Sequence, residues 1–167
     1  MALDPVPAGD RAARMGADDR TPLMFALDIP FVEALGMRLW RYADGVAEVS
    51  LDVQPSMLNS WQVAHGGVVM TLLDVAMAHA ARRSDPVATG EHSGVVTVEM
   101  KTTFMRPGIG RLLGRGALLH RTASMAFCEA TVVNPDGERV AHATGTFKYL
   151  KRLPVGGRVI HRDDASD

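Results

Sequence analysis

The chain has 167 residues, of which 47% are hydrophobic and 22% are charged. This length favours a single domain with a substantial buried core. The formal net charge of −1 leaves no basic field for nucleic acid, and no apolar run is long enough to cross a bilayer. The first 20 residues lack the apolar region of a signal peptide, and a single cysteine, Cys128, excludes an internal disulfide. We therefore expect a cytoplasmic protein without a membrane or nucleic-acid partner, in which Cys128 is a small buried hydrophobe.

The N-terminal half of the chain predicts a hairpin followed by one long helix. Residues 1–20 show no periodicity and predict a disordered tail. A short helix is expected over 25–35. The alternating stretches 37–42 and 46–53 flank Ala43-Asp44-Gly45 and predict two strands joined by a turn. Residues 55–64 predict a loop, and 66–83 predict a helix that is apolar nearly all round and therefore buried.

The C-terminal half predicts four further strands. A polar break over 84–90 precedes them, and they are expected over 95–105, 112–121, 125–134 and 139–150. Pro107-Gly108 ends the first of them, and Pro135-Asp136-Gly137 predicts a tight turn before the last. Residues 151–167 predict a polar tail, which leaves one domain over 21–150. A helix that is apolar all round beside antiparallel strands predicts an α+β fold, with the sheet wrapped around the helix.

The segment from Asn59 to Asp74 carries the strongest chemical signal. His65-Gly66-Gly67 opens the long helix, where free backbone N–H groups and partial positive charge collect. Asp74 lies two turns further on, and a charge inside an apolar element is costly unless it is paired or used. An acceptor site for an oxyanion and a carboxylate in one segment indicate carbonyl chemistry. Two structural interpretations stay open: a paired carboxylate for Asp74, and close backbone packing for the glycines.

This pattern resembles the hotdog-fold thioesterases, in particular the phenylacetate-pathway branch of the 4-hydroxybenzoyl-CoA thioesterase superfamily. The spacing that carries the resemblance is Asn59 six residues before His65 and Asp74 nine residues after it. The blocks 95–107 and 141–147 also match, and the resemblance covers 36–150. The chain departs from the family at Ser60-Trp61 and in a longer segment over 84–94, so the acyl substrate is what these departures leave open.

The resemblance implies hydrolysis of an acyl-CoA thioester without a cofactor. It implies that Asp74 is the general base or nucleophile and that the amide of Gly67, with that of Gly66, polarises the thioester carbonyl. The residues implied to orient the carbonyl or the attacking water are Asn59, His65 and Thr97. Each of these three also has a structural interpretation, namely an Asx turn, a hydrogen-bonded histidine and a strand former, respectively. The side chains expected to line the acyl pocket are Met57, Leu58 and Trp61.

The spacing of the two principal groups predicts a site shared between subunits. Gly67 and Asp74 are seven residues apart, which is roughly 10 Å along a helix axis. Because reacting groups must approach to about 3 Å, one carbonyl cannot reach both groups of the same chain. An antiparallel pair of central helices about a two-fold axis would join Asp74 of one subunit to Gly67 of the other. We expect a homodimer as the minimal active unit, and the resemblance implies a dimer of dimers, a homotetramer.

Two other functions remain to be distinguished from hydrolysis. One is a hotdog dehydratase or hydratase acting on acyl thioesters, and the other is a non-catalytic acyl-CoA-binding module. No two histidines have the spacing of a metal site, so no metal is expected. The basic residues available in principle for CoA phosphates, none of them assigned, are Arg106, Arg111, Arg121, Lys148, Lys151 and Arg152.

Overall fold

The computed structural model describes residues 21–25, 27–43, 45–82 and 94–150. The predicted tails over 1–20 and 151–167 and the predicted break over 84–90 lie outside these residues. The elements in chain order are α1 (Pro30–Ala34), β1 (Arg38–Ala43), β2 (Val46–Asp52), a 3-10 turn (Pro55–Met57), α2 (Gly66–Ala81), β3 (Gly94–Phe104), β4 (Arg111–Arg121), β5 (Met125–Val133) and β6 (Arg139–Leu150).

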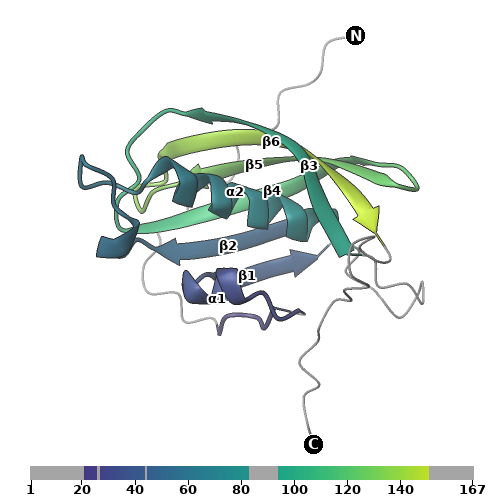
Figure 1. Ribbon diagram of the computed structural model, residues 1–167, viewed down its shortest axis with the longest axis horizontal. Helices are drawn as coiled ribbons and strands as arrows, with labels where there is room; N and C mark the ends of the chain where they lie inside the picture. Colours follow the sequence, from purple (N-terminus) through teal and green to yellow (C-terminus); the bar gives the residue numbers. More distant parts are fainter. Residues whose placement is uncertain (1–20, 26, 44, 83–93, 151–167) are drawn as a thin grey trace, which may run out of the picture.

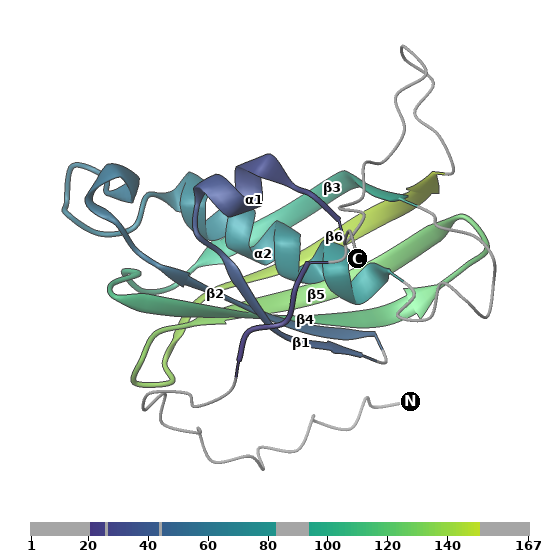
Figure 2. The ribbon, with the colours of Figure 1, turned by 90° about the horizontal axis from the view of Figure 1, so that it is seen from below.

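The described strands form one antiparallel sheet that curves around α2. Their order in the sheet is β1-β2-β4-β5-β6-β3, so β1 and β3 are the edge strands. Helix α2 lies along one face of this sheet (Figure 1), and α1 lies on the same side (Figure 2). The predicted α+β hotdog architecture, with a sheet around one long helix, is therefore confirmed.

Helix α2 packs directly onto the backbone of β4. A Cβ atom at Gly116 would collide with the carbonyl oxygen of Ala76, and one at Gly114 would lie 3.0 Å from Leu72 Cγ. Leu72, Ala76 and Met77 are fully buried in this contact layer. Such close approach of helix and strand requires glycine, and it fixes the depth of the helix over the sheet.

The element boundaries differ from the expected ones in two informative places. The helix expected over 25–35 is only Pro30–Ala34, with proline at its first turn, where the missing N–H costs least. Gly36, at φ +68°, follows its end. The long helix ends at Ala81, two residues before the predicted end. The four later strands agree with the predicted ranges to within one residue.

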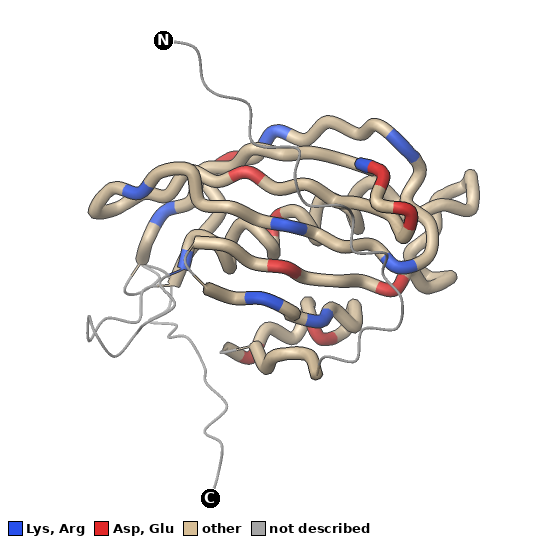
Figure 3. The backbone as a smooth tube through the Cα atoms, turned by 180° about the vertical axis from the view of Figure 1, so that it is seen from behind, with Lys and Arg blue, Asp and Glu red and all other residues tan. Residues whose placement is uncertain are grey.

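Seen from the outer side of the sheet, Lys and Arg positions are interspersed with Asp and Glu positions along the strands (Figure 3). Cross-strand ion pairs lie on it, including Arg115 with Glu48 at 3.3 Å and Arg111 with Asp52 at 2.7 Å. Along the described residues, no helix has the length and apolar character needed to span a membrane.

Candidate active site

His65 is the N-cap of α2, and its side chain binds the helix's own backbone. His65 Nδ1 accepts a hydrogen bond from the N–H of Gly67 at 3.0 Å, while the carbonyl of His65 accepts from Val68 and Val69. The backbone N–H of His65 is itself held by the carbonyl of Met57 at 2.8 Å. Because a backbone N–H can only donate, Nδ1 is unprotonated and the neutral ring carries its proton on Nε2.

The free donor at this helix end is the N–H of Gly66. Gly67, the residue predicted to polarise a carbonyl, already donates to His65, whereas the N–H of Gly66 has no hydrogen-bond partner among the described residues. Gly66 is half-buried and is the first residue of α2, where the helix dipole adds partial positive charge. The turn can thus present one backbone donor to an incoming carbonyl oxygen.

Asp74 lies on the side of α2 that meets β3. Thr97 Oγ1 donates to Asp74 Oδ1 at 2.7 Å, which joins two residues that the sequence singled out separately. Burial raises the pKa of the Asp74 carboxyl above its ordinary value, and the Thr97 hydrogen bond lowers it in part. No ion pair to Asp74 occurs in the described part of the chain. The result is a carboxylate that is more basic than an exposed aspartate and is oriented by one hydroxyl.

Asn59 organises the loop before α2. Its Oδ1 accepts from the backbone N–H groups of Trp61, at 2.9 Å, and Val63, at 3.4 Å. The structural interpretation, an Asx turn, is therefore present, and a direct role of Asn59 on substrate stays a prediction. Of the three side chains expected at the acyl pocket, Met57 is buried in the core, Leu58 is half-buried and Trp61 is 84% exposed.

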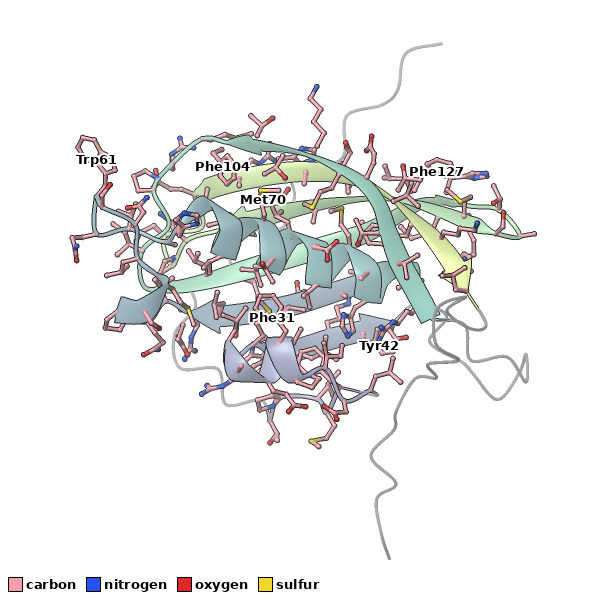
Figure 4. All side chains as sticks on the ribbon, in the orientation of Figure 1. Phe31, Tyr42, Trp61, Met70, Phe104 and Phe127 are labelled. Carbon is pink, nitrogen blue, oxygen red and sulfur yellow. The ribbon has the colours of Figure 1, made fainter. Side chains whose placement is uncertain are left out.

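Phe104 is a site residue that the sequence reasoning missed. Its ring lies 3.4 Å from the position that a Cβ on Gly66 would occupy, so it packs beside the residue that carries the free amide. Simple alternation along β3 would put Phe104 and Thr97 on opposite faces. A bulge between Thr97 and Glu99 shifts the register, and both residues face α2. Figure 4 shows Phe104 and Met70 near the N-terminal half of α2.

Of the four candidate basic residues that the structure describes, three are already engaged. Arg111 pairs with Asp52, Arg106 lies 3.6 Å from Glu138, and Arg121 donates to the carbonyl of Ala81. Lys151 and Arg152 lie outside the described residues. Within the described ranges, no cluster of three or more potential metal ligands is found. Cys128 is buried, and burial raises the pKa of its thiol to about 11, so it is a poor nucleophile.

The fold is that of a hotdog protein, and its central helix carries a free backbone donor at its N-terminus and a half-buried carboxylate two turns further on. The sequence model of a protein family, described as Thioesterase superfamily, matches residues 62–141. The medium/long-chain acyl-CoA thioesterase YigI of Salmonella typhimurium is 30% identical over 136 residues, covering 74% of this chain and 88% of YigI. The chain therefore belongs to the thioesterase superfamily and is a thioester hydrolase.

Similarities to two further proteins support this assignment. The acyl-coenzyme A thioesterase PaaI of Escherichia coli is 28% identical over 129 residues, covering 76% of this chain and 84% of PaaI. The structure of the conserved protein PA5202 from Pseudomonas aeruginosa superposes with a TM-score of 0.67 at 30% identity, covering 75% of this chain and 97% of that one. The E. coli PaaI structure superposes with a TM-score of 0.65.

Proposed function

We propose that the protein hydrolyses acyl-CoA thioesters to a free acid and CoA at sites shared between two subunits. The observation that carries the proposal is the pair of groups on α2: a Gly66 N–H at its N-terminus that is free among the described residues, and a half-buried, Thr97-bonded Asp74. Similarity to YigI and PaaI, both acyl-CoA thioesterases by name, supports the substrate class and favours hydrolysis over hydration or simple binding.

The two-subunit arrangement is supported by the path of β3. Gly66 and Asp74 are eight residues apart, about 12 Å along the helix, so one carbonyl cannot contact both. Strand β3 meets Asp74 at Thr97 and meets Gly66 at Phe104, and its outer edge is unpaired within the described sheet. A two-fold axis crossing β3 midway between these contacts would place Gly66 opposite the partner subunit's Asp74.

The reaction then follows from the two helix positions. The thioester carbonyl accepts the hydrogen bond from Gly66 N–H, which strengthens as negative charge develops on the oxygen. In one route, the partner subunit's Asp74 takes a proton from water, the resulting hydroxide adds to the carbonyl carbon, and the C–S bond breaks as the proton passes to the thiolate. In the other route, the carboxylate attacks the carbonyl carbon, the C–S bond breaks, and CoA leaves as a thiolate; water then hydrolyses the anhydride, and the proton it releases passes to the thiolate. A single turnover in ¹⁸O-water followed by mass analysis of Asp74 tests for the second route, since label in the carboxyl requires an anhydride that water opens at Asp74.

The substitution Asp74→Asn tests the assignment of the carboxylate. We expect a loss of about 10²–10⁴ in kcat for acyl-CoA hydrolysis, because the amide cannot accept the proton of water or attack the carbonyl. The fold should persist, since Asn is nearly isosteric and its side-chain oxygen can still accept from Thr97. Thiol release gives the rate, and circular dichroism gives the fold. Retention of wild-type turnover by a folded variant would contradict the assignment.

Mixing two inactive variants tests whether the site is shared. Asp74→Asn retains an intact Gly66 and Gly66→Pro retains an intact Asp74, so a mixed dimer holds one complete site if the groups come from different subunits. Random pairing after joint refolding makes half the dimers mixed, so about a quarter of wild-type activity should return. A site within one chain predicts no recovery. Pairing of dimers into a tetramer remains a prediction.

A further inference from the structure

Two connected segments form an exposed apolar surface around the N-terminus of α2. Segments 58–64 and 104–110 are joined by the hydrogen bond from Ala64 N–H to the carbonyl of Gly108, at 2.8 Å. Several of their large apolar side chains remain exposed in the chain: Trp61 at 84%, Ile109 at 62%, Phe104 at 51% and Met105 at 46%. Large apolar groups gathered on one part of a surface mark a binding region more often than single exposed residues do.

Hydrogen bonds within segment 58–64 fix the conformation of the loop that carries Trp61. Asn59 closes the loop through its side chain and also through the bond from its own N–H to the carbonyl of Val63, at 2.9 Å. Gln62 has φ +60°, a left-handed conformation that costs free energy for a residue with a side chain. Figure 4 shows Trp61 at the tip of this loop, pointing away from the body of the molecule. Backbone strain at Gln62 next to an indole that is 84% exposed indicates a functional constraint on this loop.

The charges around these segments favour an apolar ligand. Segment 58–64 holds no ionisable residue. The one arginine of segment 104–110, Arg106, pairs with Glu138 at 3.6 Å, and Arg111, which follows the segment, pairs with Asp52 at 2.7 Å. Phosphates of CoA would thus meet no unpaired arginine on these two segments, whereas an aliphatic chain would meet exposed indole, phenyl and branched side chains.

We propose that Phe104 and Trp61 lie at the two ends of a subsite for a long aliphatic acyl chain. The inference rests on the proposed function, because the chain is attached to the carbonyl bound by Gly66. Phe104 packs beside Gly66, so the first carbons of an acyl group whose carbonyl is bound there would pass its ring. Only a chain that extends beyond Phe104 reaches Trp61. Trp61 therefore selects for chain length, which gives a role to the residue by which this loop departs from its family.

The test compares kcat/KM across butyryl-, octanoyl-, lauroyl- and palmitoyl-CoA, below their micelle concentrations. In Trp61→Ala, the ratio of palmitoyl to butyryl kcat/KM should fall about tenfold, the equivalent of two buried methylene groups. Trp61→Phe, which keeps an aromatic face, should recover most of the ratio. Phe127→Ala is the matched control, because Phe127 is an exposed aromatic residue on β5 at the opposite end of the molecule (Figure 4). It should leave the ratio unchanged.

Each other outcome counts against a separate claim. An equal loss of kcat/KM for all four substrates in Trp61→Ala would assign Trp61 to the CoA moiety and overturn the acyl subsite. Wild-type kcat/KM for all four substrates in this variant would overturn the acyl subsite as well. If the wild type hydrolyses none of these substrates, the proposed function fails instead.

A binding measurement gives a second readout that does not depend on turnover. The chain has two tryptophans, so Trp40→Phe combined with Asp74→Asn leaves Trp61 as the only indole in an inactive protein. Palmitoyl-CoA should shift the Trp61 emission to shorter wavelength, and free CoA should not. An equal shift with free CoA would overturn the proposal.

Discussion

At its N-terminus, helix α2 keeps a backbone donor free, whereas at its C-terminus side chains from two strands close off the last carbonyl. Tyr149 OH donates to the carbonyl of Ala81 at 2.6 Å, and Arg121 Nη2 donates to the same oxygen at 3.0 Å. Arg121 Nε also donates to Tyr149 OH at 2.7 Å, so the two side chains support each other. A cation at this end is favourable because the helix dipole is negative there.

The difference between the ends separates a C-terminal end whose last carbonyl is satisfied from an N-terminal end for which we propose a chemical role. Helix termini leave four N–H and four C=O groups without helical partners, and stability favours satisfying all of them. At the C-terminal end, Arg121 and Tyr149 satisfy the carbonyl of the last helical residue, Ala81. The N-terminal end departs from it at Gly66 alone, beside a half-exposed Phe104. An unsatisfied donor at a helix N-terminus is the feature that an oxyanion requires.

The substitution Gly66→Pro acts on the N-terminal end of α2 and should have the largest effect. Proline removes only the N–H, is well accepted at the first helical position, and suits the extended conformation of His65 before it (φ −58°, ψ 140°). We expect kcat to fall about 10²–10³-fold while the free energy of unfolding changes little, because one oxyanion donor is lost. Thiol-release assays measure kcat, and chemical denaturation measures the free energy of unfolding.

Gly66→Ala is the matched control for this prediction. It keeps the amide, and its Cβ would lie 3.4 Å from the Phe104 ring, an ordinary contact. Activity close to that of the wild type is expected. If the proline and alanine variants lose activity equally, the amide of Gly66 is not the donor, and the amide of Gly67 becomes the better candidate.

The buried histidine near the closed end should make stability depend on pH. His79 is 3% exposed, its Nδ1 donates to the carbonyl of Val75 at 2.8 Å, and its Nε2 has no partner among the described residues. Burial, and secondarily the charge of Arg82, lowers the pKa of His79 from 6.5 to about 4. The unfolded chain therefore binds more protons between pH 6.5 and 4, and the free energy of unfolding should decrease as pH falls through that window, by up to about 3 kcal/mol.

His79→Gln isolates this contribution. Glutamine does not titrate in this range and its amide can still donate to Val75. Urea denaturation at pH 7, 6, 5 and 4 should show a shallower loss of stability on acidification for the variant than for the wild type. Parallel curves would mean that other groups cause the acid sensitivity and that His79 is not held neutral by burial.

The contrast between the two ends also separates what the sequence could predict from what it could not. The helix, the strands and the His65-Gly66-Gly67 turn followed from periodicity and local residue chemistry. The engagement of the Gly67 amide by His65 depends on a rotamer, and the placement of Phe104 depends on a bulge in β3 that strand alternation does not reveal.

The closed end was beyond sequence reasoning for a different reason. Arg121 and Tyr149 are 40 and 68 residues from Ala81 in the chain. Only the antiparallel order of the sheet brings them to the end of α2. Arg121 was one of several candidates for CoA phosphates, and nothing local distinguished a helix-capping arginine from a ligand-binding one. Contacts that depend on topology need the topology first.

The smallest effect is expected for Tyr149→Phe, which acts only on the closed end. The variant keeps the ring and loses one hydroxyl, and with it the bonds to the Ala81 carbonyl and from Arg121. Because Arg121 still donates to Ala81, the free energy of unfolding should fall by only about 1–2 kcal/mol. Turnover should be unchanged, since the free amide lies at the other end of a 16-residue helix. Denaturation and thiol release on the same preparation give both values. A drop in kcat at unchanged stability would show that the two ends of α2 are coupled through the helix, and that its closed end takes part in positioning Asp74.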